Sequence, residues 1–259
     1  MQIKDIVTCL DEWFPIELAN EEDATKVGFT IGSKTETLQN ILLTLDLTKQ
    51  VIEEAINLNA NFIIAHHPFP YYPLATFFSN DEHTQILEKM MTNHISFYAA
   101  HTNMDVAEHG VNDTLASVLE LKNIKKEVKR DSYLRVGDIE SVSLTDFCFY
   151  VKEKFNIKGL KIVGSPNKMI RRVGIVGGSG CHLEEIKQAM EAGCDVYLTG
   201  EFKLSSVQYA DFHQLAMIEI PHGLEKLSLN HLQMRLKNRL EAKYEVHISK
   251  INTDPIWFA

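Results

Sequence analysis

The chain has 259 residues, 45% of them hydrophobic and 24% charged, which suits one large globular core or two domains of ordinary size. Its 26 basic and 35 acidic residues give a net charge of -9, which disfavours bulk binding to nucleic acid because a phosphate backbone is also negative. Apolar runs of only a few residues exclude a transmembrane helix, and polar residues interrupt the N-terminal stretch where a secretory signal would be continuous, so we expect a cytoplasmic protein. Four widely spaced cysteines without a C-x-x-C pair indicate incidental thiols.

The first predicted elements form a strand, a helix and a second strand. NILLTLD at 40–46 predicts a short buried strand, Thr48 suits the N-cap of a following helix, and NFIIAHH at 61–67 predicts the next strand. Together they have about the 30-residue length of a βαβ unit. A third strand is predicted to end near His101, and VNDTLASVLEL at 111–121 is compatible with a helix.

The middle of the chain carries a charged, repetitive stretch, LKNIKKEVKRD at 121–131. We expect the boundary between two halves there, which gives an N-terminal α/β domain at 1–125 and a C-terminal α/β domain at 126–259. Beyond this stretch, LTDFCFYVKEKFNI at 144–157 predicts an amphipathic helix, and KGLKIVG at 158–164 predicts a strand.

The second half repeats the order of the first. RVGIVGGSG at 172–180 predicts a strand that ends in a glycine turn, HLEEIKQAMEAG at 182–193 a helix, and CDVYLTGE at 194–201 a strand. Aligning this second strand with NFIIAHH needs no gap and sets His67 against Glu201. A further strand is predicted to end before His222, followed by a helix-compatible run. The fold class is therefore α/β, with two similar, pseudo-duplicated domains.

Polar residues gather at the predicted strand ends, which is where open α/β sheets bind ligands. His66 and His67 follow one strand, and other strand ends supply His101 with Asp105, His222 with Glu225, and Glu201. An isolated histidine pair is more often a hydrogen-bonded surface feature. Imidazoles and carboxylates that converge on one sheet edge instead indicate a divalent metal site.

The spacing of these residues indicates two ions. Consecutive side chains on a strand point to opposite faces, so His66 and His67 are served more easily by two neighbouring ions than by one. His222 and Glu225 share a face if a helix begins there, although an ordinary first-turn glutamate fits the same spacing. His101 and Asp105 are four residues apart in HTNMD, which fits a turn at least as well as a helix. Asp105 is favoured as the ligand of this pair, with His101 as a supporting or substrate group.

The glycine-rich stretch VGGSG at 176–180 has two interpretations. It lacks the spacing of a dinucleotide-binding loop and the Lys-Ser/Thr of a Walker loop, so a tight turn is favoured over a phosphate cradle.

At these residues the sequence resembles the NGG-interacting-factor-like family, whose bacterial members are often named GTP cyclohydrolase 1 type 2 homologues. The resemblance rests on six segments in order: KVGFTIGS, AHHPFP, HTNMDVAEHGVNDTLA, GIVGGSG, DVYLTGEFK and PHGLEK. Relatives commonly read W-D-N-x-G-L where this chain has 24–29, ATKVGF, and carry a histidine where it has Ser205 and Ser206. Their last pair is often four residues apart, whereas His222 and Glu225 are three apart here.

The resemblance implies a compact form without an inserted domain, a dinuclear metal site at the interface of the two domains, and assembly into a toroidal homohexamer. It also implies the ligand set, with the last residue as the bridge between the ions: His66, His67, Asp105, His222 and Glu225. Zinc, iron, manganese and nickel all suit such ligands.

The leading hypothesis is a divalent-metal-dependent hydrolase that acts on a nucleotide, converting GTP to dihydroneopterin triphosphate and formate. His101 and Glu201 are the candidates for proton transfer. Lys203, Lys34 and the glycine-turn amides are candidates for binding the triphosphate. The alternatives are a metal-binding scaffold or regulatory interaction protein without efficient turnover, and a general phosphoester hydrolase.

Overall fold

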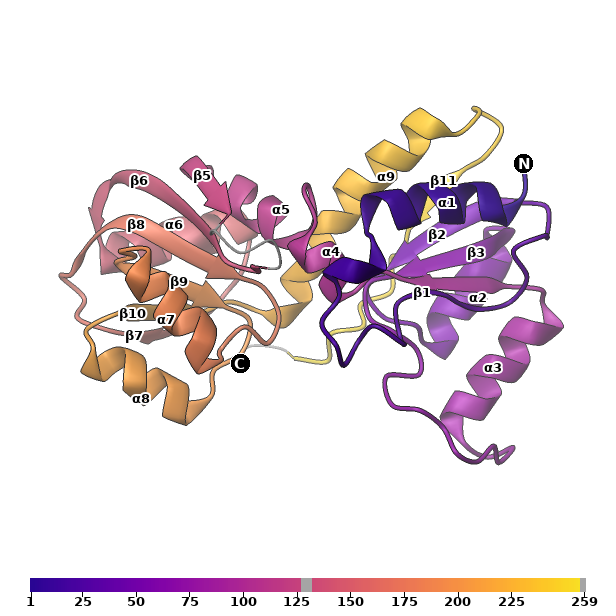
Figure 1. Cartoon of the computed structure of the whole chain (residues 1–259), viewed down its shortest axis with the longest axis horizontal. Helices are drawn as coiled ribbons and strands as arrows, with labels where there is room; N and C mark the ends of the chain where they lie inside the picture. Colours follow the sequence, from indigo (N-terminus) through magenta and orange to yellow (C-terminus); the bar gives the residue numbers. More distant parts are fainter. Residues whose placement is uncertain (127–131, 257–259) are drawn as a thin grey trace. The chain divides into compact units, whose positions relative to one another are not determined.

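A computed structural model describes residues 1–126 and 132–256 of the chain (Figure 1). These residues form two compact units. The first contains Met1–Glu108 and Leu229–Pro255, and the second contains His109–Ser228 together with Ile256. The domain boundary expected at 125/126 falls inside the second unit, and part of the charged stretch on which it rests, 127–131, lies outside the described residues.

The first unit is built on a five-stranded sheet in the order β1-β4-β3-β2-β11. β2, β3, β4 and β11 are parallel, and β1 pairs antiparallel with β4 at one edge. Its elements are α1 (Ile3–Trp13), the 3-10 helix η1 (Ile16–Leu18), β1 (Gly28–Ile31), β2 (Asn40–Thr44), α2 (Lys49–Asn57), β3 (Ala60–Ala65), α3 (Glu82–Thr92), β4 (Ser96–Ala99), α4 (Thr102–Val106), α9 (Ser228–Arg239, from Leu229 on) and β11 (Val246–Ile248).

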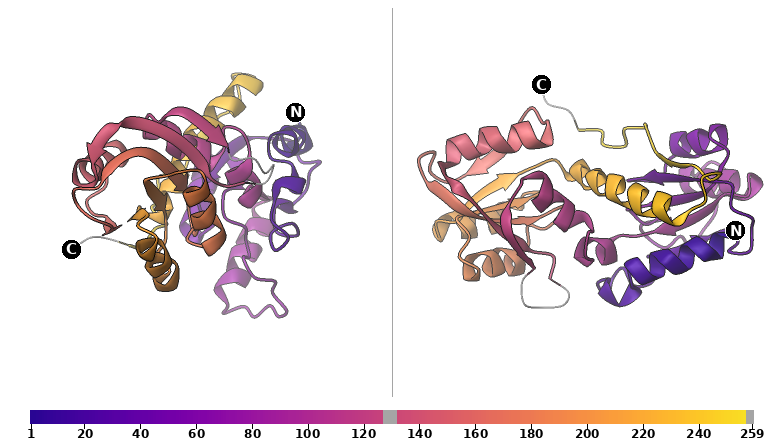
Figure 2. Two further views of the ribbon diagram at one scale, coloured as in Figure 1. Left: turned by 60° about the vertical axis from the view of Figure 1, so that its left-hand side comes forward. Right: turned by 90° about the horizontal axis from the view of Figure 1, so that it is seen from above.

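Helices cover both faces of this sheet, so its central strands are buried on both sides. All six residues of β3 are buried. Leu42, Ile63 and Phe97 share one core with α2 and α3. On the opposite face α1 and α9 lie side by side, with the guanidinium of Arg235 4.1 Å from the ring centre of Trp13 (Figures 1 and 2).

The second unit is built on a six-stranded sheet in the order β5-β6-β8-β9-β10-β7. β8, β9 and β10 are parallel, and the other three strands join antiparallel. Its elements are α5 (Val111–Val118), β5 (Lys122–Lys126), β6 (Arg135–Ser143), α6 (Leu144–Phe155), β7 (Lys161–Val163), β8 (Met169–Val176), α7 (Leu183–Glu191), β9 (Val196–Thr199), α8 (Leu204–Phe212), β10 (Ala216–Glu219) and the 3-10 helix η2 (His222–Leu227).

The helices of the second unit also divide between the two faces of its sheet. α7 and α8 share a core with β8, β9 and β10 that includes Ile186, Tyr197 and Met217. α5 and α6 lie on the other face, where the phenol of Tyr150 donates a hydrogen bond to the carbonyl of Leu119 at 2.9 Å (Figure 2).

The two sheets share a topological pattern. Three parallel strands joined by helices, β2-α2-β3-α3-β4 in one and β8-α7-β9-α8-β10 in the other, each end beside an antiparallel edge strand, β1 or β7. They differ at the other side, where β11 is parallel to β2 but β6 is antiparallel to β8. The predicted α/β class with two sheets is confirmed, and the shared order supports the predicted duplication.

Most elements predicted from the sequence are present. The Thr48 hydroxyl caps α2 by accepting a hydrogen bond from the amide of Val51 at 3.2 Å, as predicted. HTNMD is not a turn: α4 is a short α-helix in which the amides of Met104 and Asp105 donate to the carbonyl of His101. No helix within the described ranges has the length and apolar character needed to cross a membrane.

Each unit contains one tyrosine that is fully buried and hydrogen-bonded. The Tyr98 phenol donates to Asp11 Oδ1 at 2.9 Å, and the Tyr197 phenol donates to the carbonyl of Gly180 at 2.6 Å. Burial, reinforced by the Asp11 charge, raises the pKa of Tyr98 above its ordinary value of 10.0, and burial raises the pKa of Tyr197 likewise. Each neutral phenol therefore stabilises the fold below about pH 10, and this contribution is lost as the pH rises further.

We predict that neither phenol ionises near pH 10 while its unit is folded. During an alkaline titration, the first rise in phenolate absorbance should be smaller than expected by the contribution of two tyrosines. A second rise in absorbance should follow when the helical circular dichroism is lost. In a Tyr98→Phe variant that second rise should be smaller by one tyrosine. A single transition near pH 10 with the amplitude of all 8 tyrosines would contradict the prediction.

Candidate metal centre

His66, His67 and His101 lie where the central strands of the first unit end. β3 stops at Ala65, but the chain stays beside β2, because the amides of His66 and His67 donate to the carbonyls of Thr44 and Leu45 at 3.2 and 2.9 Å. The carbonyl of Ala65 accepts from the amide of Ala100, which places His101 at the same edge.

The three imidazoles form one cluster. Ring centres are 5.0 Å apart for His66 and His67, 5.2 Å for His66 and His101, and 5.5 Å for His67 and His101. One ring nitrogen from each lies within 4.8 Å of the others, a spacing at which they could hold a metal ion. The end of β3 frees the two neighbouring histidines from the alternation of a strand, so both reach the same place.

An oxygen acceptor contacts Nδ1 of every histidine in this cluster. His66 Nδ1 is 2.8 Å from the carbonyl of Ala100, His67 Nδ1 is 2.6 Å from Asp46 Oδ1, and His101 Nδ1 is 2.5 Å from Asp23 Oδ2. Because a carbonyl oxygen only accepts, Nδ1 of His66 carries a proton, and in the neutral imidazole the lone pair is therefore on Nε2. Carboxylates that hold Nδ1 in this way are the usual partners of metal-binding histidines.

The two carboxylates are themselves held in place. Burial acts to raise the pKa of Asp23, but the hydrogen bonds from His101 and Thr102 and the charge of Lys26 outweigh it, so the pKa lies below its ordinary value. The pKa of Asp46 is lowered in the same manner, with burial outweighed by contacts from His67 and from Thr253, whose hydroxyl donates at 2.5 Å. Both groups are therefore carboxylates at neutral pH.

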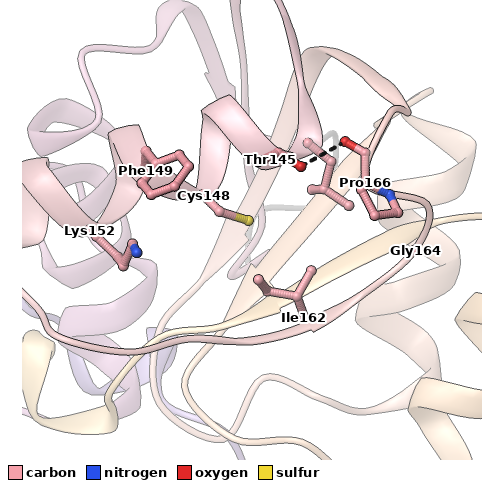
Figure 3. A pocket seen from close by; sticks show the side chains of 8 residues that line it. Thr145, Cys148, Phe149, Lys152, Ile162, Gly164 and Pro166 are labelled. Carbon is pink, nitrogen blue, oxygen red and sulfur yellow. Dashed lines mark hydrogen bonds between the residues drawn. The ribbon is translucent and has the colours of Figure 1, made fainter.

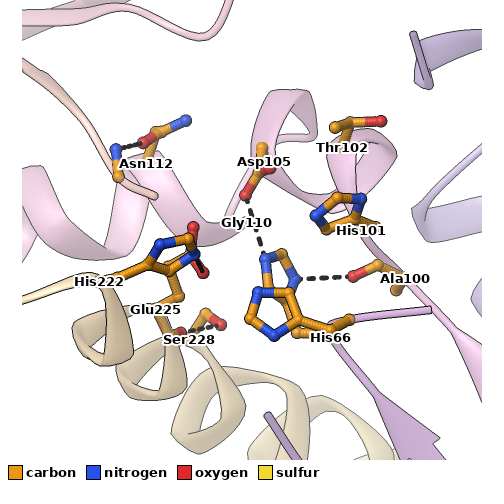
Figure 4. Close-up of polar contacts among 12 residues, drawn as sticks. His66, Ala100, His101, Thr102, Asp105, Gly110, Asn112, His222, Glu225 and Ser228 are labelled. Carbon is orange, nitrogen blue, oxygen red and sulfur yellow. Dashed lines mark hydrogen bonds and ion pairs between the residues drawn. The ribbon is translucent and has the colours of Figure 1, made fainter. Parts of the chain in front are cut away.

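Asp105 joins this cluster from α4. Its Oδ1 lies 3.7 Å from Nε2 of His66, the nitrogen that carries the lone pair (Figure 4). α4 begins directly after His101, so its first turn brings the carboxylate back beside the imidazoles. In the first unit, therefore, His66 is surrounded by His67, His101 and Asp105. All four were predicted from the sequence as ligands or proton carriers.

The second unit holds a smaller group of the same chemistry at η2. His222 Nε2 is 3.1 Å from Glu225 Oε2, so the three-residue spacing does place both side chains on one face. His222 Nδ1 is 2.6 Å from Glu201 Oε1, which repeats the pattern of an oxygen at Nδ1. The side chain of Glu225 is 4% exposed and that of Glu201 is 56% exposed.

The glycine turn that follows β8 packs against Glu225. Asn112 Oδ1 accepts a hydrogen bond from the amide of Gly177 at 2.7 Å (Figure 4). Gly178 has φ +56, and a Cβ built on it would lie 2.3 Å from Glu225 Oε1. This is the tight turn favoured by the sequence, and it braces a carboxylate.

We predict that Gly178→Ala weakens metal binding by displacing the Glu225 carboxylate. Gly193→Ala is the matched control, because Gly193 also has positive φ (+73) but a Cβ there meets nothing within 4 Å. Both variants should lose about 1 kcal/mol of unfolding free energy from the strained backbone. Only Gly178→Ala should bind metal less tightly in a competition titration with a chelator. Equal metal affinity in the two variants would contradict this role of the turn.

The lysines predicted to bind phosphate lie outside both groups. Lys203 precedes α8, and its ammonium lies 3.3 Å from His182 Nδ1. The ammonium of Lys34 lies 5.3 Å from the ring centre of Phe29.

The second unit also contains a pocket of about 390 Å³ between α6 and β7 (Figure 3). Mainly apolar side chains line it, including Cys148, Phe149 and Ile162, and Lys152 lies at its side. None of the ligand, catalytic or substrate-binding residues predicted from the sequence lines this pocket.

The sequence reasoning missed the carboxylates that orient the histidines. Asp46 lies two residues beyond β2, so a carboxylate at a strand end was an available signal. Asp23 has no such signal, because 78 residues separate it from His101.

Comparisons with known proteins match nearly the whole chain to one family. The family model described as Duf34/NIF3 (NGG1p interacting factor 3) matches residues 1–255. A Clostridium acetobutylicum protein named GTP cyclohydrolase 1 type 2 homolog is 30% identical over 269 residues, covering 100% of this chain and 99% of that protein. The two chains therefore match over nearly their full lengths.

Two crystal structures have the same fold. A Staphylococcus aureus hypothetical protein is 30% identical with a TM-score of 0.91, and the match covers 100% of this chain and 99% of that one. A Bacillus cereus protein related to NIF3 is 25% identical with a TM-score of 0.91 and the same coverage.

Proposed function

Because the chain belongs to the Duf34/NIF3 (NGG1p interacting factor 3) family, we propose that it is a metal-dependent hydrolase with a dinuclear site that acts on GTP or a similar nucleotide. The activity is that in the name of its relatives, GTP cyclohydrolase 1 type 2 homolog. We propose that both units contribute ligands to this site and that it lies at their interface.

The observation that carries this proposal is the oxygen acceptor at Nδ1 of each imidazole concerned. In four histidines arranged this way Nε2 is available as a metal ligand. A carboxylate also lies near Nε2 of two of them, Asp105 at His66 and Glu225 at His222. These ligand types suit divalent zinc, iron, manganese or nickel. The proposed ligands are His66, His67, Asp105, His222 and Glu225. Glu225 is the proposed bridge, because each of its two oxygens could serve one cation.

When bound, the two cations would supply a water of lowered pKa and polarise the bond that is hydrolysed. The residues of the chain provide the proton transfers. His101 is held by Asp23 so that its Nε2 can take up or release a proton, and the exposed Glu201 carboxylate can accept one through its contact with His222. We propose that water opens the imidazole ring of GTP and a second water releases its carbon as formate. The ribose carbons then rearrange and condense with the freed amine, with loss of one water, to give dihydroneopterin triphosphate. We propose that Lys203 binds the triphosphate.

We also propose that the protein assembles into a toroidal homohexamer. α8 supports self-association because it presents large apolar side chains to water, with Leu204 73% and Phe212 82% exposed. Light scattering should then give six times the 29.5 kDa mass of the chain. A Phe212→Glu variant should give smaller species.

The direct test is to measure metal per chain, then assay stripped and reloaded protein for formate release from GTP and for cleavage of a phosphodiester. The hydrolase requires metal-dependent formate release that His67→Ala abolishes. Phosphodiester cleavage alone would favour a general phosphoester hydrolase. Full metal occupancy without turnover would favour a scaffold or regulatory protein, and only trace metal would overturn the proposal entirely.

A further inference from the structure

Two adjacent tyrosines in the segment between β3 and α3 expose aromatic rings to water. Tyr71 is 43% and Tyr72 is 74% exposed. Their ring centres are 5.0 Å apart with planes at 82°, so the two rings form a corner. Aromatic surface left in water is unfavourable, and such surface beside a polar site commonly contacts a ligand.

Tyr71 is fixed beside the histidine cluster. Its ring centre is 6.1 Å from that of His101, with the planes at 83°. The ammonium of Lys26 lies 4.6 Å from the Tyr71 ring centre and 3.6 Å from Asp23 Oδ1. Asp23 in turn holds His101. One carboxylate therefore fixes both the imidazole and the lysine that lies over the tyrosine.

This arrangement restricts the ring while leaving much of it accessible. Lys26 is held by Asp23, and its side chain is 17% exposed, so it acts as a support for the ring through a cation–π contact. A ring held in one orientation loses little further freedom when a planar molecule stacks on it. Neither tyrosine belongs to the buried core of the first unit that includes Phe69.

We propose that Tyr71 and Tyr72 form the aromatic wall of a subsite for a planar nitrogen heterocycle, with Lys26 as a positioning residue. The inference rests on the proposed function, because it places the base of a purine nucleotide beside His101. Stacking on an aromatic ring tolerates any base, so the subsite provides affinity for the heterocycle, and the polar groups around His101 select the bond to be attacked. The phosphate groups of the nucleotide lie outside this subsite.

The test measures binding to metal-loaded, full-length protein by calorimetry, with GTP and inorganic tripolyphosphate as probes. Tyr71→Ala should weaken GTP binding roughly tenfold or more and leave tripolyphosphate binding unchanged. Tyr71→Phe keeps the ring and should bind GTP as the wild type does. Phe78→Ala is the matched control, because Phe78 is a 63% exposed aromatic residue of the same segment.

The outcomes separate this subsite from the hydrolase itself. GTP binding that ignores Tyr71→Ala, equal losses for both probes, or no GTP binding by the wild type would overturn the subsite. Formate release that is unaffected by Tyr71→Ala would leave the hydrolase standing without it. Tyr71-dependent GTP binding without formate release would retain the subsite and remove the hydrolase.

Discussion

His66→Ala is expected to weaken metal binding by more than about 100-fold, a larger loss than the 10- to 100-fold typical when only a partner of a ligand is removed. His66 is 1% exposed, and the hydrogen bond from its Nδ1 to the carbonyl of Ala100 fixes the ring. Its Nε2 is therefore held beside Asp105 as a metal ligand. Metal content after gel filtration and the affinity in chelator competition measure the effect.

Two further variants make this result specific. Asp46→Asn removes the carboxylate at His67 Nδ1 and should cost about 10- to 100-fold, an intermediate effect. His83→Ala is the control, because His83 also lies near a carboxylate, Asp81 at 3.7 Å, but stands outside the cluster. Circular dichroism of the metal-free variants checks that they are folded. If the folded His66→Ala protein held metal as tightly as His83→Ala, the proposed ligand set would be wrong.

The second large effect is expected from Asp113→Ala in the second unit. Arg135 is 1% exposed, and its Nε donates to Asp113 Oδ1, while its other contacts include the carbonyls of Ser132 and Tyr133 at 3.0 and 3.2 Å. Removing the carboxylate takes an ion-pair partner from a buried cation, which should cost about 3 kcal/mol or more of unfolding free energy. Denaturation with urea measures it.

A second ion pair in the same unit is the matched control. Arg172 and Asp138 lie 3.2 Å apart, but both side chains are 33% exposed, so Asp138→Ala should cost at most about 1 kcal/mol. Adding Arg135→Met to Asp113→Ala should recover most of the loss, because the buried charge that lost its partner is then gone as well. If the double variant were no more stable than Asp113→Ala, the loss would have a different cause, such as the 2.6 Å bond that Asp113 accepts from the amide of His109.

The elements that could be predicted from the sequence are those with local signals. Periodic apolar residues marked β2, α2 and β3, with Thr48 at the helix start. α4 has only five residues, too few for a helical period to be visible, and its hydrogen bonds return to a strand-end histidine. β5 is a strand in which every residue is exposed, so its charged sequence resembled a linker, and only its pairing with β6 reveals it.

The candidate site divides in the same way. The sequence singled out the imidazoles and Glu225 as candidate ligands because they follow predicted strand ends, where a parallel sheet collects ligands from different parts of the chain. The partners that orient them were harder to predict, since Asp23 and Asp46 reach His101 and His67 through tertiary contacts. Gly178 was recognisable as a turn residue, but its contact with Glu225 was not, because the two residues are 47 positions apart in the sequence.

The last strand of the first sheet has a consequence for the order of folding during synthesis. β11 completes a sheet whose other strands are made before residue 100, and residues 109–228 of the second unit are synthesised in between. The second unit is a nearly continuous segment and can fold as soon as it leaves the ribosome, whereas the first must wait for its closing segment. Thr253, which donates to Asp46 behind His67, arrives with that segment. The nascent chain therefore completes the support of this imidazole only after residues 109–228 of the second unit have been synthesised.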